Sequence, residues 1–133
     1  MRLALAVALL TSLGAAPSTA DDVAAAAYPG ARQLLEREVE GRSIRIRFRC
    51  YATPDPLEKV AAYYEKDPRF ARAEWRMEKG ERAFALRSDP NLHVALFPGA
   101  NAALHRQCEA TPGPGDKTLL QISQASPRPS PAH

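Results

Sequence analysis

Hydrophobic residues and arginines alternate over residues 44–50, where the sequence reads IRIRFRC. A period of two is typical of a strand that buries one of its faces. The segment before it alternates in the same way with glutamates, and Gly41-Arg42 between the two segments fits a two-residue hairpin loop. The hairpin then brings apolar residues together on one face and opposite charges on the other. The predicted pairs are Val39 with Ile44, Leu35 with Phe48, Glu38 with Arg45, and Glu36 with Arg47.

The spacing of apolar residues becomes helical after Pro56. They recur at positions i, i+3, i+4 and i+7, as on the buried side of an amphipathic helix: Leu57, Val60, Ala61 and Tyr64. Asp55 and Glu58 have the spacing of a capping box, and Pro68 disfavours helical backbone at the residue before it. The pattern therefore predicts a helix over about residues 55–66.

Strand-like alternation returns beyond this helix. Turns are expected at 79–80 and 89–91, and the pairs across them are Trp75 with Phe84 and Leu86 with Val94. Two further strands are expected at 104–109 and 118–124. Together these elements predict an α+β domain, in which a mostly antiparallel sheet of about six strands curls over one helix. The expected core collects the large apolar residues of all these elements: Leu35, Val39, Ile44, Ile46, Phe48, Leu57, Val60, Tyr64, Trp75, Phe84, Leu86, Val94, Leu96, Leu120 and Ile122.

The two ends of the 133-residue chain differ in character from this domain. Residues 1–20 have one basic residue, an apolar run and then small residues, which is the pattern of a secretory signal peptide cleaved after Ala20. We expect a short linker at 21–27, a single domain at 28–125 and a disordered, proline-rich tail at 126–133. The protein is therefore expected to be exported, to the periplasm or the medium. The apolar run is too short to span a bilayer, so no stable membrane insertion is expected after cleavage.

The chain has two cysteines, Cys50 and Cys108, and both lie in the part expected to be exported. In an oxidising compartment two cysteines most simply form one disulfide, which would add stability to a domain of this small size. The alternative is a metal site formed by Cys50, His93, His105 and Cys108, which would require both thiols to be reduced.

The net charge of +3 is too small to indicate a nucleic-acid or membrane partner by itself. Arg45, Arg47 and Arg49 line one face of a predicted strand, as a phosphate-binding ribbon would. The glutamates predicted on the neighbouring strand would cancel most of that local field, so we expect a solvated outer face and no nucleic-acid partner.

The segments YPGA (28–31) and YATPDPLEKVAAYY (51–64) resemble a pattern found in small exported bacterial proteins. In those proteins a YPGA-like turn precedes a strand, and a Thr-x-Asp helix start leads into a Val-x-x-[Phe/Tyr]-Tyr helix. The resemblance covers about residues 28–124 and rests on turn and cap motifs, so it implies a fold rather than a chemistry. Proteins of this group are largely uncharacterised, and the resemblance implies no catalytic residues and no cofactor.

Three function classes follow from these observations. The first is a non-catalytic exported module that either has an envelope-associated role or binds an unknown protein or small molecule, in a cleft rimmed by Tyr51, Tyr63 and Trp75. The second is a small hydrolase-like enzyme that uses His93 or His105, although no nucleophile or dinucleotide motif is present. The third is the metal-binding module described above.

Overall fold

The computed structural model describes residues 21–74, 78, 80–99, 108 and 113–128. They form a six-stranded antiparallel sheet in the order β1-β2-β6-β5-β4-β3. The strands are β1 (Arg32–Glu40), β2 (Ile44–Thr53), β3 (Phe70–Arg72), β4 (Arg82–Leu86), β5 (Asp89–Pro98) and β6 (Thr118–Pro127), and the helices are α1 (Asp22–Ala25) and α2 (Leu57–Lys66). The α+β class and the six-stranded, antiparallel sheet predicted from the sequence are confirmed.

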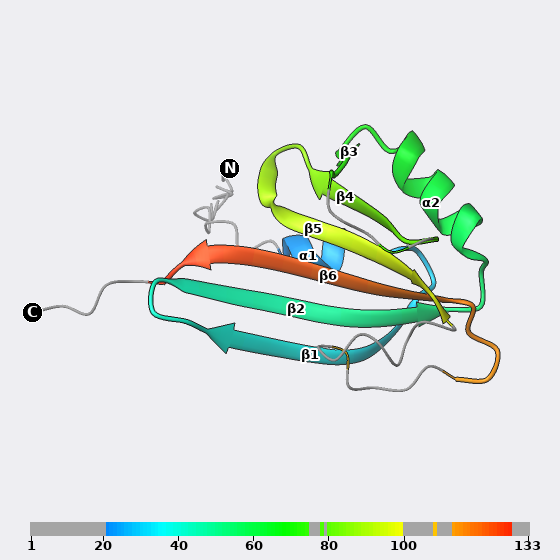
Figure 1. Ribbon diagram of the computed structural model, residues 1–133, viewed down its shortest axis with the longest axis horizontal. Helices are drawn as coiled ribbons and strands as arrows, with labels where there is room; N and C mark the ends of the chain where they lie inside the picture. Colours follow the sequence, from blue (N-terminus) through cyan, green and yellow to red (C-terminus); the bar gives the residue numbers. More distant parts are fainter. Residues whose placement is uncertain (1–20, 75–77, 79, 100–107, 109–112, 129–133) are drawn as a thin grey trace, which may run out of the picture.

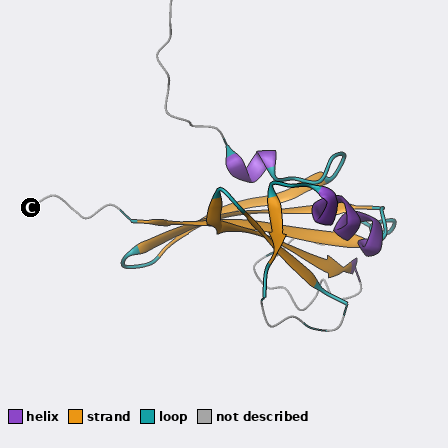
Figure 2. Ribbon diagram, turned by 90° about the horizontal axis from the view of Figure 1, so that it is seen from above, coloured by secondary structure: helices purple, strands orange, loops and turns teal. Residues whose placement is uncertain are grey.

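Both helices lie on the same side of the sheet (Figure 2), which we call the helix side. Its core joins Val23, Val60 and Tyr64 to the inward residues of the central strands. The other side carries a second cluster around Phe48, Cys50 and Cys108, and we call it the disulfide side. The sheet therefore buries apolar residues on both of its faces, whereas the sequence pattern predicted a single core.

The β1–β2 hairpin has the predicted faces in a different register. Val39 pairs with Ile46 and not with Ile44, because the tip of the hairpin lies at Arg42-Ser43, one residue later than predicted, and the Gly41 N–H donates to the Ile44 carbonyl at 2.8 Å. A slip of two residues returns every side chain to the same face, since strand side chains alternate with a period of two. The apolar and charged faces were thus predicted correctly, while the pairing partners were wrong.

The β4–β5 hairpin shows a similar two-residue shift. Phe84 pairs with Val94, because the turn lies at Arg87-Ser88 and the register then shifts, so that Leu86 pairs with Asp89 but Ala85 pairs with His93. The predicted pair of Leu86 with Val94 is therefore wrong, although both residues are buried on the helix side as expected.

The strand expected to place Trp75 opposite Phe84 is shorter and lies earlier in the chain. Arg72, and not Trp75, pairs with Phe84, and β3 ends at Arg72. Trp75 and Lys79 lie outside the described residues, as do most of the strand expected at 104–109 and all of the segment expected to be a signal peptide.

Helix α2 begins at Leu57, with Pro56 at the N-cap position and no side-chain cap. The capping box predicted from Asp55 and Glu58 does not form, because the N-cap is Pro56 and Asp55 lies one residue before it. The Asp55 carboxylate instead accepts a hydrogen bond from the Tyr28 hydroxyl at 2.6 Å. This bond links the YPGA turn to the start of the helix.

The segment expected to be a linker, 21–27, is packed against the domain. Asp21 caps the short helix α1 by accepting a hydrogen bond from the Ala24 N–H at 3.1 Å. Val23 and Ala26 enter the helix-side core, and the buried Tyr64 hydroxyl donates to the Ala26 carbonyl at 2.6 Å. A short, alanine-rich stretch lacks the periodicity that identifies a helix in sequence, but its small residues fit closely against Tyr64.

The strands at one edge are long, and they extend past the helices. Figure 1 shows the β1–β2 loop and the end of β6 reaching away from α2. We call this the distal end. β6 continues to Pro127, so its last two residues, Ser126 and Pro127, come from the segment expected to be a tail. Val39 and Ile44, both expected in the core, are exposed there.

Candidate functional site

The cleft expected between helix and sheet is filled by side chains. Tyr51 is buried in the helix-side core, and Tyr63 makes edge-on ring contacts with Tyr28 and Tyr64 at 5.3 and 5.0 Å between ring centres. Trp75, the third residue of the expected rim, lies outside the described residues. Tyr51 and Tyr63 therefore act as packing residues and do not form the rim of an open cleft.

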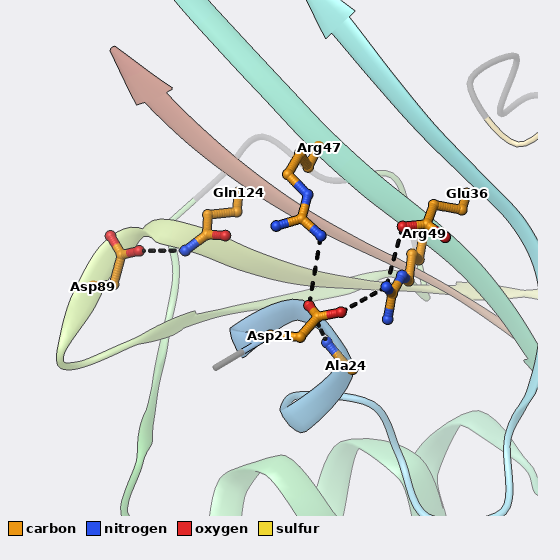
Figure 3. Close-up of polar contacts among 7 residues, drawn as sticks. All are labelled: Asp21, Ala24, Glu36, Arg47, Arg49, Asp89 and Gln124. Carbon is orange, nitrogen blue, oxygen red and sulfur yellow. Dashed lines mark hydrogen bonds and ion pairs between the residues drawn. The ribbon is translucent and has the colours of Figure 1, made fainter. Parts of the chain in front are cut away.

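The arginine row of β2 lies on the helix side, and its members Arg47 and Arg49 lie beside α1 (Figure 3). Arg45 contacts Glu38 at 3.3 Å and Glu40 at 3.0 Å. Arg49, whose side chain is 15% exposed, contacts Glu36 at 3.1 Å and Asp21 at 2.6 Å. The glutamates of β1 thus pair with this row as the alternating pattern predicted.

Asp21 is the partner that sequence reasoning missed. It contacts Arg47 at 3.8 Å as well as Arg49, and it caps α1 at the same time (Figure 3). Burial would raise the pKa of the Asp21 carboxyl, but the Ala24 N–H and the Arg49 guanidinium outweigh it and hold that pKa below its ordinary value. The carboxylate therefore stays charged, and it offsets much of the positive field of the row.

The two cysteines form the predicted disulfide. Cys50 lies in the centre of β2, and its Cα is 5.9 Å from that of Cys108. Sulfurs joined in this way cannot serve as thiolate ligands, so a metal site through Cys50, His93, His105 and Cys108 is incompatible with the bridge. Among the described residues, which do not include His105, no group of three or more His, Cys, Asp and Glu residues is placed to hold a metal ion.

His93 lies in β5 on the disulfide side, directly opposite Ser123 of β6. Burial lowers the pKa of its imidazole, and the nearby Asp89 carboxylate acts in the other direction. A histidine beside a serine is a pairing that nucleophilic catalysis uses. Three grooves on the described surface lie elsewhere, however, beside α1, beside β3 and at the distal end, and none is lined by either residue.

The exposed apolar surface is at the distal end, on the disulfide side. Val39 is 46% exposed and Ile44 is 42% exposed. Among the described residues, these two are the large hydrophobic residues that are exposed to solvent. The register places both on one face, because Val39 pairs with Ile46, Ile46 with Ala125, and Ile44 with Pro127. We call Val39, Ile44, Ile46, Ala125 and Pro127 the distal patch.

The distal patch continues the buried cluster of the disulfide side, against which Ile46 packs. A shallow groove of about 250 Å³ runs beside it, lined by Ile44, Ala125 and Pro127 together with Ser43, Asn91 and Ser126. The other face of the same strands carries the paired charges of Arg45 and Glu40. The distal end is therefore an amphipathic piece of sheet with one apolar face open.

The part of the chain that the structure describes contains no helix with the length and apolarity needed to cross a membrane. Comparison with known proteins gives no similarity from which a function could be carried over. The chain matches no protein family model, no curated protein and no solved structure.

Proposed function

We propose that the protein is an exported, non-catalytic module that binds a protein partner through the distal patch. The observation that carries this proposal is the joint exposure of Val39 and Ile44 on one face of the sheet. Large apolar side chains exposed side by side are typical of protein interaction sites. The signal-peptide pattern and the disulfide support a role outside the cytoplasm.

The shape of the surface favours a protein over a small molecule. Pockets for drug-sized ligands hold roughly 300–1,000 Å³ and enclose most of the ligand. The groove at the distal patch has about 250 Å³ and is open, so it would leave much of such a ligand in water. A flat apolar face next to a polar one instead matches the core and rim of a protein interface.

Site-directed photo-crosslinking tests this proposal. A benzophenone amino acid at Ile44 is expected to capture one partner in the exported fraction of the native host. The same group at Glu58 of α2, whose side chain is 79% exposed, serves as the matched control and is expected to capture none.

The captured protein is then purified, and its affinity is measured with wild type and with the double variant Val39→Ser, Ile44→Ser. Burying the exposed half of each side chain contributes about 1 kcal/mol, so the double variant is expected to weaken binding about 30-fold. Equal labelling at both positions, or an unchanged Kd for the double variant, would refute the distal patch as the binding surface.

A further inference from the structure

The edge of the sheet next to the distal patch is a long strand with one open side. β1 is the outermost strand and has nine residues, and within the described residues it pairs with β2 alone. β3, at the opposite edge, has three residues. Figure 1 shows β1 along one border of the sheet, with β2 beside it. An edge of this length can accept another strand through its backbone N–H and C=O groups.

The hydrogen-bond pattern shows which residues of β1 face outward. Gly41 and Ile44 form a bonded pair, since the Gly41 N–H donates to the Ile44 carbonyl at 2.8 Å. In an antiparallel ladder bonded and non-bonded pairs alternate. Glu36, Glu38 and Glu40 therefore belong to the non-bonded pairs with β2, and their backbone groups point toward the free edge.

The side chains of these same three residues determine which strand fits. Their side chains lie on the helix side and are 51%, 49% and 41% exposed, even though each contacts an arginine of β2. On the other side of β1, Val39 belongs to the distal patch, and the half-buried Arg37, two residues before it, already interacts with another group. An added strand would therefore need cationic residues on one face and apolar residues on the other.

A second copy of β1 does not meet this requirement. Added antiparallel about a two-fold axis normal to the sheet, it would place its own glutamates against these three, and like charges directly opposite are destabilising. The strand that already pairs with β1 has the required pattern, because arginine alternates with isoleucine and phenylalanine in β2.

We infer that β1 binds an extended segment of the partner in which Arg or Lys alternates with apolar residues, and that this segment joins the sheet as a seventh strand. This inference rests on the proposed function, and it specifies the chemistry of the partner. The backbone bonds give the segment its extended conformation, the glutamates select its cations, and Val39 packs against its apolar face. Each exposed ion pair is expected to change the affinity by about two- to fivefold.

The probe is a fluorescent peptide with the sequence of residues 44–49, IRIRFR, and binding to the oxidised full-length protein is followed by anisotropy. IEIEFE, with glutamates in place of arginines, is expected not to bind. RRRIIF, which has the same composition without the alternation, is expected to bind at least tenfold more weakly. Equal affinity for IRIRFR and RRRIIF would show a merely electrostatic attraction and overturn the inference.

The matched protein variants are Glu38→Pro and Glu38→Ala. Both lose the carboxylate, but the proline alone removes the outward N–H and leaves the β1–β2 bonds in place. Glu38→Pro is expected to bind IRIRFR at least tenfold more weakly than Glu38→Ala, and equal binding would overturn strand addition. If Glu38→Pro does not fold, amide exchange of the wild type decides. The peptide should slow exchange at Glu36, Glu38 and Glu40, and unchanged rates at these amides would overturn the inference.

The same pair of variants separates this inference from the proposed function. A captured partner that depends on Val39 and Ile44 but binds Glu38→Pro and Glu38→Ala equally would refute strand addition and leave the distal patch as the site. A partner that is indifferent to Val39 and Ile44 would refute the proposed function itself. Formation of dimers by the wild-type protein through β1, detected by sedimentation and lost in Glu38→Pro, would contradict the argument from like charges.

Discussion

Truncating Val23 tests whether the segment 21–27 is part of the folded domain. Val23 is 1% exposed and lies in the helix-side core. Val23→Ala removes two methyl groups, which costs about 1.6 kcal/mol in transfer free energy, and the remaining cavity adds about 1 kcal/mol. Alanine regains a few tenths of a kcal/mol because it has the higher helix propensity. We therefore expect the free energy of unfolding to fall by about 2 kcal/mol.

Val39→Ala is the matched control, because it makes the same chemical change at a side chain that is 46% exposed. Its expected cost is below about 1 kcal/mol, since about half the transfer term applies and no closed cavity forms. Urea unfolding of the oxidised protein, followed by circular dichroism, gives both values. Equal losses in the two variants would show that α1 does not stabilise the domain, and would restore the interpretation of 21–27 as a linker.

Three further predictions concern single contacts. Removing the disulfide by Cys50→Ala, Cys108→Ala should lower the free energy of unfolding by about 4 kcal/mol, because the bridge joins residues 58 apart; an unchanged urea midpoint on reduction of the wild type would contradict this. The hydrogen bond from Tyr28 to Asp55 raises the Tyr28 pKa to about 12 and holds the Asp55 pKa below its ordinary value. Its stabilisation should therefore be complete between about pH 4 and pH 10, fade as pH rises from about 10 through 12, and fade as pH falls below the usual Asp range. Tyr28→Phe should flatten both limbs of the melting temperature against pH, and unchanged limbs would count against the bond. The buried Thr118 hydroxyl donates to the Asp55 carbonyl at 2.7 Å, so Thr118→Val, which keeps the shape of the side chain, should lose about 1 kcal/mol; unchanged thermal stability of this variant would argue against the contact.

Alternation was enough to predict the faces of the strands, but it could not fix their pairing. Arg47 pairs with Glu38 in the structure and was expected opposite Glu36. Both registers put Glu opposite Arg and apolar residues opposite one another, because a two-residue slip preserves the period. The choice between them depends on the position of the turn, which lies at Arg42-Ser43 and was expected at Gly41-Arg42.

The contacts that join distant segments had no signal in the sequence. Asp21 neutralises Arg49 across 28 positions of the chain, and Tyr28 reaches Asp55 across 27. A capping motif describes neighbours along the chain, so Asp55 was assigned to the helix start, where it had a local partner in Glu58. The disulfide was accessible to prediction for the opposite reason, since two cysteines in an exported chain leave a single pairing.

The exposure of the distal patch follows from the lengths of the elements. β2 and β6 have ten residues each and span roughly 33 Å, whereas α2, also of ten residues, spans about 15 Å. On the helix side the uncovered length is charged, so it needs no cover. On the disulfide side it remains apolar, and the described residue from outside the sheet that packs there is Cys108, held at Cys50. Ile44 is six residues along β2 from that anchor, or about 20 Å. The alternation of β2 thus continues well past its described cover, and this is the surface to which the proposed function assigns the partner.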